Sequence, residues 1–60
     1  MKRHEMLKEI RSYVESKPNR DISTYTHVSK IGRLYIHLLN LYTLKIEKVT
    51  IADFYNEYVV

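Results

Sequence analysis

The sequence contains no cysteine and no tryptophan, and it has only one glycine and one proline. The lack of cysteine excludes disulfide bonds and thiolate metal sites, and it is the usage expected of a protein kept in a reducing cytosol. Long apolar runs are missing as well, since every uninterrupted stretch is far shorter than the roughly 20 residues that cross a bilayer. We therefore expect a cytoplasmic protein with no membrane partner.

The length of the chain limits it to one domain, 1–60, with one hydrophobic core. Apolar residues make up 45% of the sequence and charged residues 28%, a balance that predicts a folded chain and not a disordered one. A core this small gives marginal stability unless a disulfide, a metal or a second subunit contributes. Because disulfides are excluded, we expect a homodimer.

Acidic residues are absent from the middle of the chain. Residues 22–46 contain three Lys or Arg, two His and no Asp or Glu, whereas residues 47–60 contain one Lys and three acids. The net charge of +3 is compatible with a polyanionic partner. The middle segment is the part that could approach phosphates without repulsion.

The first apolar pattern has helical spacing. One helical face carries apolar residues, which predicts a helix over residues 3–16; they are Met6, Leu7, Ile10, Tyr13 and Val14. Pro18 lacks an amide hydrogen and disfavours a helical conformation in the residue before it, so the helix must end there.

Two further helices are predicted around the single glycine. Thr24 can cap a short helix that runs to residue 31, and Gly32 then suits a tight turn. From Arg33 the apolar residues again recur with helical spacing, and Arg33, His37 and Asn40 form a polar stripe at i, i+4 and i+7. Residues 43–49 fit either a short strand or a continued helix, and we favour the strand.

A last amphipathic helix is predicted after Thr50. Thr50 and Asp53 resemble a capping box, in which both side chains satisfy free amides of the first turn. The apolar face that follows either completes the core of the monomer or forms a dimer seam. We predict the dimer interface on this face, at Ile51, Phe54, Tyr55, Tyr58 and Val59.

The order of these elements resembles the helix-turn-helix superfamily, and its winged-helix branch in particular. The segments that carry the resemblance are 6–14, 18–23, 28–32 and 38–41 within residues 5–47. The resemblance implies a mainly α fold with a three-helix core, a short strand at 43–49 and a C-terminal amphipathic helix. Arg33 departs from the family pattern, which prefers an apolar residue after the turn glycine.

The resemblance also implies a function. In such families the third helix enters the major groove of duplex DNA, so Arg33, His37 and Asn40 would contact base edges. The phosphate contacts would be made by Arg20, Thr26, Ser29 and Lys30. The same polar stripe also fits the solvated side of any surface helix. We expect a sequence-specific transcription regulator that binds double-stranded DNA as a homodimer.

Catalysis and metal binding are not expected. The three histidines, His4, His27 and His37, lack the spacing of a metal site, and sixty residues can hardly build a catalytic cleft. We predict no enzyme activity, no cofactor and no small-molecule substrate. The alternative function is a helical protein–protein interaction module, such as a small inhibitor or adaptor, in which residues 33–49 form one long helix.

Overall fold

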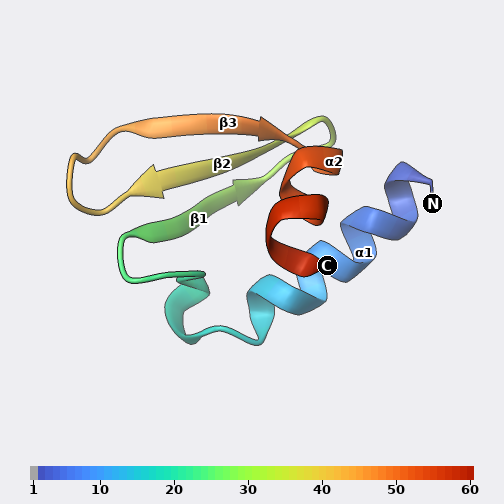
Figure 1. Ribbon diagram of the computed structural model, residues 1–60, viewed down its shortest axis with the longest axis horizontal. Helices are drawn as coiled ribbons and strands as arrows, with labels where there is room; N and C mark the ends of the chain where they lie inside the picture. Colours follow the sequence, from blue (N-terminus) through green and yellow to red (C-terminus); the bar gives the residue numbers. More distant parts are fainter. Residues whose placement is uncertain (1) are drawn as a thin grey trace.

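The computed structural model describes residues 2–60 and contains a three-stranded antiparallel sheet flanked by helical segments (Figure 1). The elements in chain order are α1 (Arg3–Glu15), a 3₁₀ turn η1 (Pro18–Arg20), β1 (Thr26–Ile31), β2 (Tyr35–Asn40), β3 (Ile46–Thr50), α2 (Ile51–Phe54) and a wide π-helical turn η2 (Tyr55–Val59). The fold is therefore α+β. The predicted mainly α, helix-turn-helix core is wrong.

The first helix matches its prediction closely. α1 buries Ile10 and Val14 on the face that the apolar spacing identified. It ends at Glu15, and Pro18 begins the 3₁₀ turn that redirects the chain toward the sheet. The proline therefore acts as predicted, because it cannot continue the helix.

The two helices predicted for the middle of the chain are strands. A bulge in β1 explains part of the error: Val28 pairs with Leu38 and Lys30 with His37, so one residue of β1 has no partner in β2. Because of this extra residue, successive apolar side chains on the same side of β1 are three residues apart in the sequence instead of two. The bulge thus produces a spacing in the sequence that is typical of a helix.

Gly32 occupies a turn as predicted, but the turn joins two strands. Its amide donates a hydrogen bond of 2.9 Å to the carbonyl oxygen of Tyr35. A Cβ atom at this position would lie 2.9 Å from the same oxygen, closer than real Cβ atoms approach. Glycine is therefore required here by the close approach of two backbone segments.

The C-terminal third contains the predicted strand and the predicted cap. β3 covers residues 46–50. The prediction had favoured a short strand over a continued helix in the overlapping segment 43–49. The Asp53 amide donates a 3.1 Å hydrogen bond to Oγ1 of Thr50, which caps α2. Since residues 33–49 are not one helix, the long-helix form of the interaction module is also wrong.

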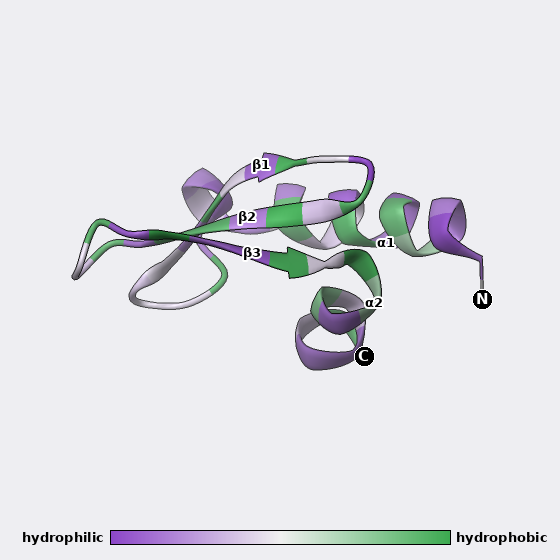
Figure 2. Ribbon diagram, turned by 90° about the horizontal axis from the view of Figure 1, so that it is seen from above, coloured by the Kyte–Doolittle hydropathy of each residue, from purple (hydrophilic) through white to green (hydrophobic). Residues whose placement is uncertain are grey.

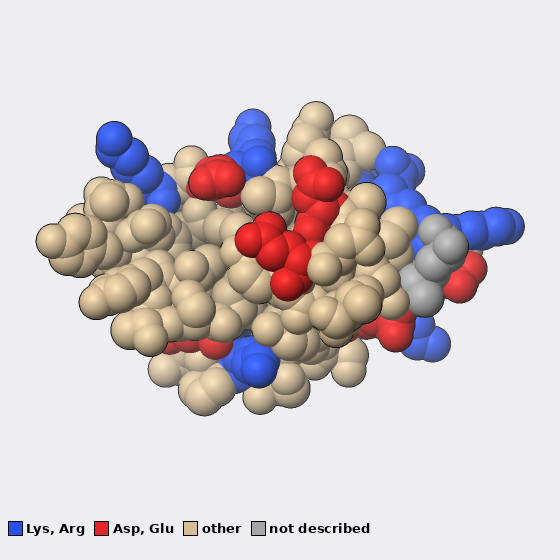
Figure 3. Space-filling view, in the orientation of Figure 1, with Lys and Arg blue, Asp and Glu red and all other residues tan. Residues whose placement is uncertain are grey.

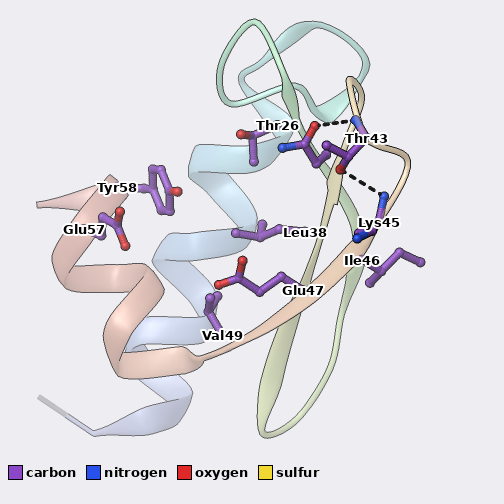
Figure 4. Close-up of a pocket in the computed structure, with 10 residues that line it drawn as sticks. Thr26, Leu38, Thr43, Lys45, Ile46, Glu47, Val49, Glu57 and Tyr58 are labelled. Carbon is purple, nitrogen blue, oxygen red and sulfur yellow. Dashed lines mark hydrogen bonds between the residues drawn. The ribbon is translucent and has the colours of Figure 1, made fainter.

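Both helical segments pack against the same side of the sheet (Figure 4). The core lies between these two layers, and its fully or nearly buried side chains are Ile10, Val14, Val28, Ile36, Leu38, Ile51 and Phe54. No helix in residues 2–60 covers the other side, which we call the open face. None of these helices combines the length and the apolar character needed to traverse a bilayer.

Candidate functional site: the open face of the sheet

The strand register determines which side chains lie on the open face. Successive residues of a strand point to opposite sides, and Ile36 and Val49 pair on the side of the helices. Figure 4 shows Leu38, Glu47 and Val49 directed toward the helices and Ile46 directed away from them. The open face is therefore formed by His27, Lys30, Tyr35, His37, Leu39, Ile46, Lys48 and Thr50.

Three basic or imidazole side chains form a row across the middle of this face. Lys30 of β1 pairs with His37 of β2, and His37 pairs with Lys48 of β3. Paired strands lie about 4.8 Å apart, so the row extends about 10 Å across the sheet. We call Lys30, His37 and Lys48 the basic row.

The bulge in β1 is fixed next to the basic row. The hydroxyl of Ser29 donates a 3.2 Å hydrogen bond to the carbonyl oxygen of His37. This bond ties the unpaired residue of β1 to the middle strand. It also holds Lys30 in the register that places it beside His37.

Tyr35 lies on the same side of β2 as His37, two residues before it. Its side chain is 45% exposed, and its partner in β3 is Thr50. On the other side of the basic row, Leu39 pairs with both His27 and Ile46. The open face therefore combines positive charge with an accessible aromatic ring and aliphatic side chains.

The carboxylate of Asp21, which contacts His27 of the open face, is already engaged. Nδ1 of His27 lies 2.7 Å from Oδ1 of Asp21, within hydrogen-bonding distance. Asp21 also forms a single bridge with His27 through the backbone, at the edge of β1. The pair therefore fastens the chain before β1 to the sheet, and no carboxylate lies in the basic row itself.

The predicted base-contact set is not brought together. Arg33 lies in the exposed turn between β1 and β2, and His37 lies on the open face. Asn40 performs a structural role, because its Oδ1 accepts hydrogen bonds from the amides of Tyr42 and Thr43 at 2.8 and 2.9 Å. A polar stripe at i, i+4 and i+7 requires a helix, and the strand period of two places Asn40 on the opposite side.

The predicted phosphate contacts are also dispersed. Arg20 lies in η1, and Thr26 lines a groove on the helix side of the sheet. Ser29 occupies the bulge, and only Lys30 joins His37 on the open face. Lys48 was missed because residues 46–50 read apolar, charged, charged, apolar, polar, a pattern without the alternation that would assign Lys48 to one side of a strand.

The predicted dimer interface belongs largely to the core of the monomer. Ile51 is 2% exposed and Phe54 is fully buried, so both are core residues and not interface residues. Tyr55, Tyr58 and Val59 are partly buried against the same core. The width of this apolar face is explained by the two elements that it covers, α1 and the sheet.

The groove on the helix side has the opposite charge character. It has a volume of about 540 Å³, and Glu47 and Glu57 contribute carboxylates to it from β3 and η2 (Figure 4). Burial, together with these two carboxylates, raises the pKa of Tyr58 in its wall. In the view of Figure 3, acidic side chains gather near the centre of the surface. This groove is unsuited to phosphates.

A second exposed surface lies at the end of the β2–β3 hairpin, which extends away from the helices (Figures 1 and 2). We call it the hairpin knob, and its apolar residues are Tyr25, Leu41, Tyr42, Leu44 and Ile46, between 41% and 80% exposed. The rings of Tyr25 and Tyr42 meet edge to face, with centroids 5.8 Å apart. The knob adjoins the open face through Ile46.

No group of three or more potential ligand side chains that could hold a metal ion occurs in residues 2–60. The two exposed surfaces therefore offer charge, aromatic rings and aliphatic contact to a partner. Comparison of the chain with family models, with curated proteins and with solved structures finds no match.

Proposed function

We propose that this chain binds single-stranded nucleic acid on the open face of its sheet. The observation that carries the proposal is the basic row of Lys30, His37 and Lys48, with Tyr35 beside it on β2 and no carboxylate within it. In this proposal the nucleic acid contacts a sheet, whereas the sequence analysis predicted DNA contacts on a helix.

The lysines of the basic row supply the electrostatic part of binding. Each phosphate that a lysine neutralises releases condensed counterions, so affinity falls as salt rises, with a slope of about −0.7 per phosphate for single strands. Two lysines give a modest slope and a modest affinity. The acidic groove lies on the other side of the sheet, behind the helix-facing side chains, and does not oppose this contact.

Tyr35 and His37 favour a single strand over a duplex. Unpaired bases stack on exposed aromatic rings, and each stacked base contributes about 1–3 kcal/mol. In a duplex the bases are already stacked on one another, so an open sheet must read groove edges instead. Tyr35 is accessible beside the lysines, which is the arrangement of a stacking surface with a charged border.

The experiment is a titration of fluorescently labelled oligo-dU and oligo-U with the whole chain, at two salt concentrations. We expect Lys48→Ala to weaken both and to reduce the salt slope by about 0.7. Tyr35→Ala should weaken binding by about fivefold or more, in line with the loss of one stacked base. Comparing oligo-dU with oligo-U, which share the phosphates and the base and differ only in the sugar, separates DNA from RNA.

Lys8→Ala is the matched control, because Lys8 is an exposed lysine of α1, on the helix side. Its loss should leave both titrations unchanged. Equal weakening by Lys8→Ala and Lys48→Ala would show only a general charge effect and would refute the site. Tighter binding of a duplex competitor than of the single strand would refute the choice of ligand.

A further inference from the structure

We propose that a second copy of this chain covers the hairpin knob, so that two copies associate through the ends of their β2–β3 hairpins. The knob holds five of the eight large apolar residues that are exposed in residues 2–60. An apolar patch of this kind on a small protein usually marks a contact surface. The inference concerns a different surface from the basic row and does not depend on nucleic-acid binding.

The knob is ordered by bonds within the chain. Oδ1 of Asn40 accepts from two amides of the turn, and the Leu44 amide donates a 2.7 Å hydrogen bond to the Asn40 carbonyl oxygen. The Leu41 amide donates to the Tyr25 carbonyl oxygen at 2.7 Å, which joins the start of β1 to the turn. A partner therefore meets a surface that is already in place, so little conformational entropy of the turn is lost on binding.

Leu44 provides a separate reason to regard the knob as a contact. Its φ is 63°, in the left-handed region that favours glycine or asparagine, so a leucine here is strained. Its side chain is nevertheless 73% exposed. Burial within the chain therefore does not compensate the strain, whereas burial against a partner would.

The charges around the knob favour another copy as the partner. Lys45 lies at one end of the groove beside the knob, and Glu47 and Glu57 line the same groove (Figure 4). None of the three takes part in an ion pair in residues 2–60. A two-fold axis between hairpin ends can place Lys45 of each copy against Glu57 of the other, because such an interface is self-complementary. A nucleic acid or an anionic lipid surface would instead meet the two carboxylates.

Sedimentation velocity from low to high micromolar protein tests this interface. We expect the wild type to dimerise with rising concentration and Leu44→Asn to weaken the dimer by about tenfold or more, as for a central contact residue. Asparagine tolerates a positive φ, so the monomer should stay folded. Leu34→Asn is the matched control, because Leu34 is 55% exposed in the turn at the opposite end of β2. It should leave the dimer unchanged.

A charge exchange tests the identity of the partner. Lys45→Glu alone and Glu57→Lys alone should each weaken self-association, whereas a mixture of the two variants should restore it, because opposite charges again face each other. The proposal is overturned if the wild type stays monomeric at all concentrations. It is also overturned if Leu34→Asn weakens the dimer as much as Leu44→Asn, or if the mixture associates no better than each variant alone.

Discussion

The two faces of the sheet are built from the same strands but differ in what covers them and in the side chains that they carry. In β2, Ile36 is fully buried and Leu38 is 7% exposed on the covered face, while Tyr35 and His37 alternate with them on the open face. The covered face supplies the apolar contacts that hold α1 and α2 to the sheet. Alternate residues of β2 thus belong either to the core or to the proposed binding face, so a substitution on one face should have little effect on the other.

Two substitutions in β2 test this separation, and the first of them has the largest expected effect of the predictions made here. Ile36→Ala removes a fully buried side chain and should lower the free energy of unfolding by about 2–5 kcal/mol, through lost transfer energy and the cavity left behind. Leu39→Ala removes a partly buried side chain of the open face and should cost less than about 1.5 kcal/mol. Urea unfolding followed by circular dichroism measures both, and equal losses would contradict the comparison.

The sequence predicted the elements whose signals are local. The spacing of Ile10 and Val14, the stop at Pro18 and the cap at Thr50 all act within a few residues of themselves, and each was confirmed. The turn at Gly32 was also confirmed, although the elements that it joins were wrong. Local interactions therefore predict where an element begins or ends more reliably than whether that element is a helix or a strand.

The sheet was not predicted, because its evidence is not local. β2 has apolar residues on both faces, since Tyr35 and Leu39 alternate with the core residues Ile36 and Leu38. Such a strand lacks the clean alternation that marks a half-buried strand, and its apolar residues also match helical spacing. The pairing partners that stabilise β2 lie in other segments of the chain.

The candidate site shared only part of its residues with the prediction. Lys30 and His37, which the helix-turn-helix resemblance implied as a phosphate contact and a base contact, lie side by side in the structure. Lys48 was missed because it lies beyond the acid-free segment 22–46, next to Glu47, which points to the other side of the sheet. Counting charges along a segment does not show on which face of a strand each charge lies. Successive residues point to opposite faces, so odd and even positions must be counted separately.

The end of the β2–β3 hairpin extends the comparison between the two faces of the sheet, because at this end neither face is covered by a helix. Stability at this end should depend on local hydrogen bonds and not on burial. Asn40→Ala removes the acceptor of two turn amides and should cost about 1 kcal/mol. Amide hydrogen exchange should become faster in residues 41–45, with α1 unchanged. Asn56→Ala, at an exposed position of η2, is the control, and an equal cost there would contradict the local role of Asn40.

The smallest expected effect concerns the bond that links the two helical segments over the covered face. The Tyr55 hydroxyl donates a 2.9 Å hydrogen bond to Oε2 of Glu9, and this bond raises the pKa of Tyr55 above its ordinary value of 10.0. Since the folded state holds the phenol proton more tightly than the unfolded chain, the stabilisation is fully present below pH 10 and is lost as the pH rises through the raised pKa. Tyr55→Phe should therefore lower the melting temperature slightly at pH 8, and the difference from the wild type should shrink at alkaline pH. Tyr35→Phe, whose hydroxyl lies on the open face, should leave the melting temperature unchanged at both pH values. A constant difference between the wild type and Tyr55→Phe across this range would show that the hydroxyl contributes through packing and not through its bond to Glu9.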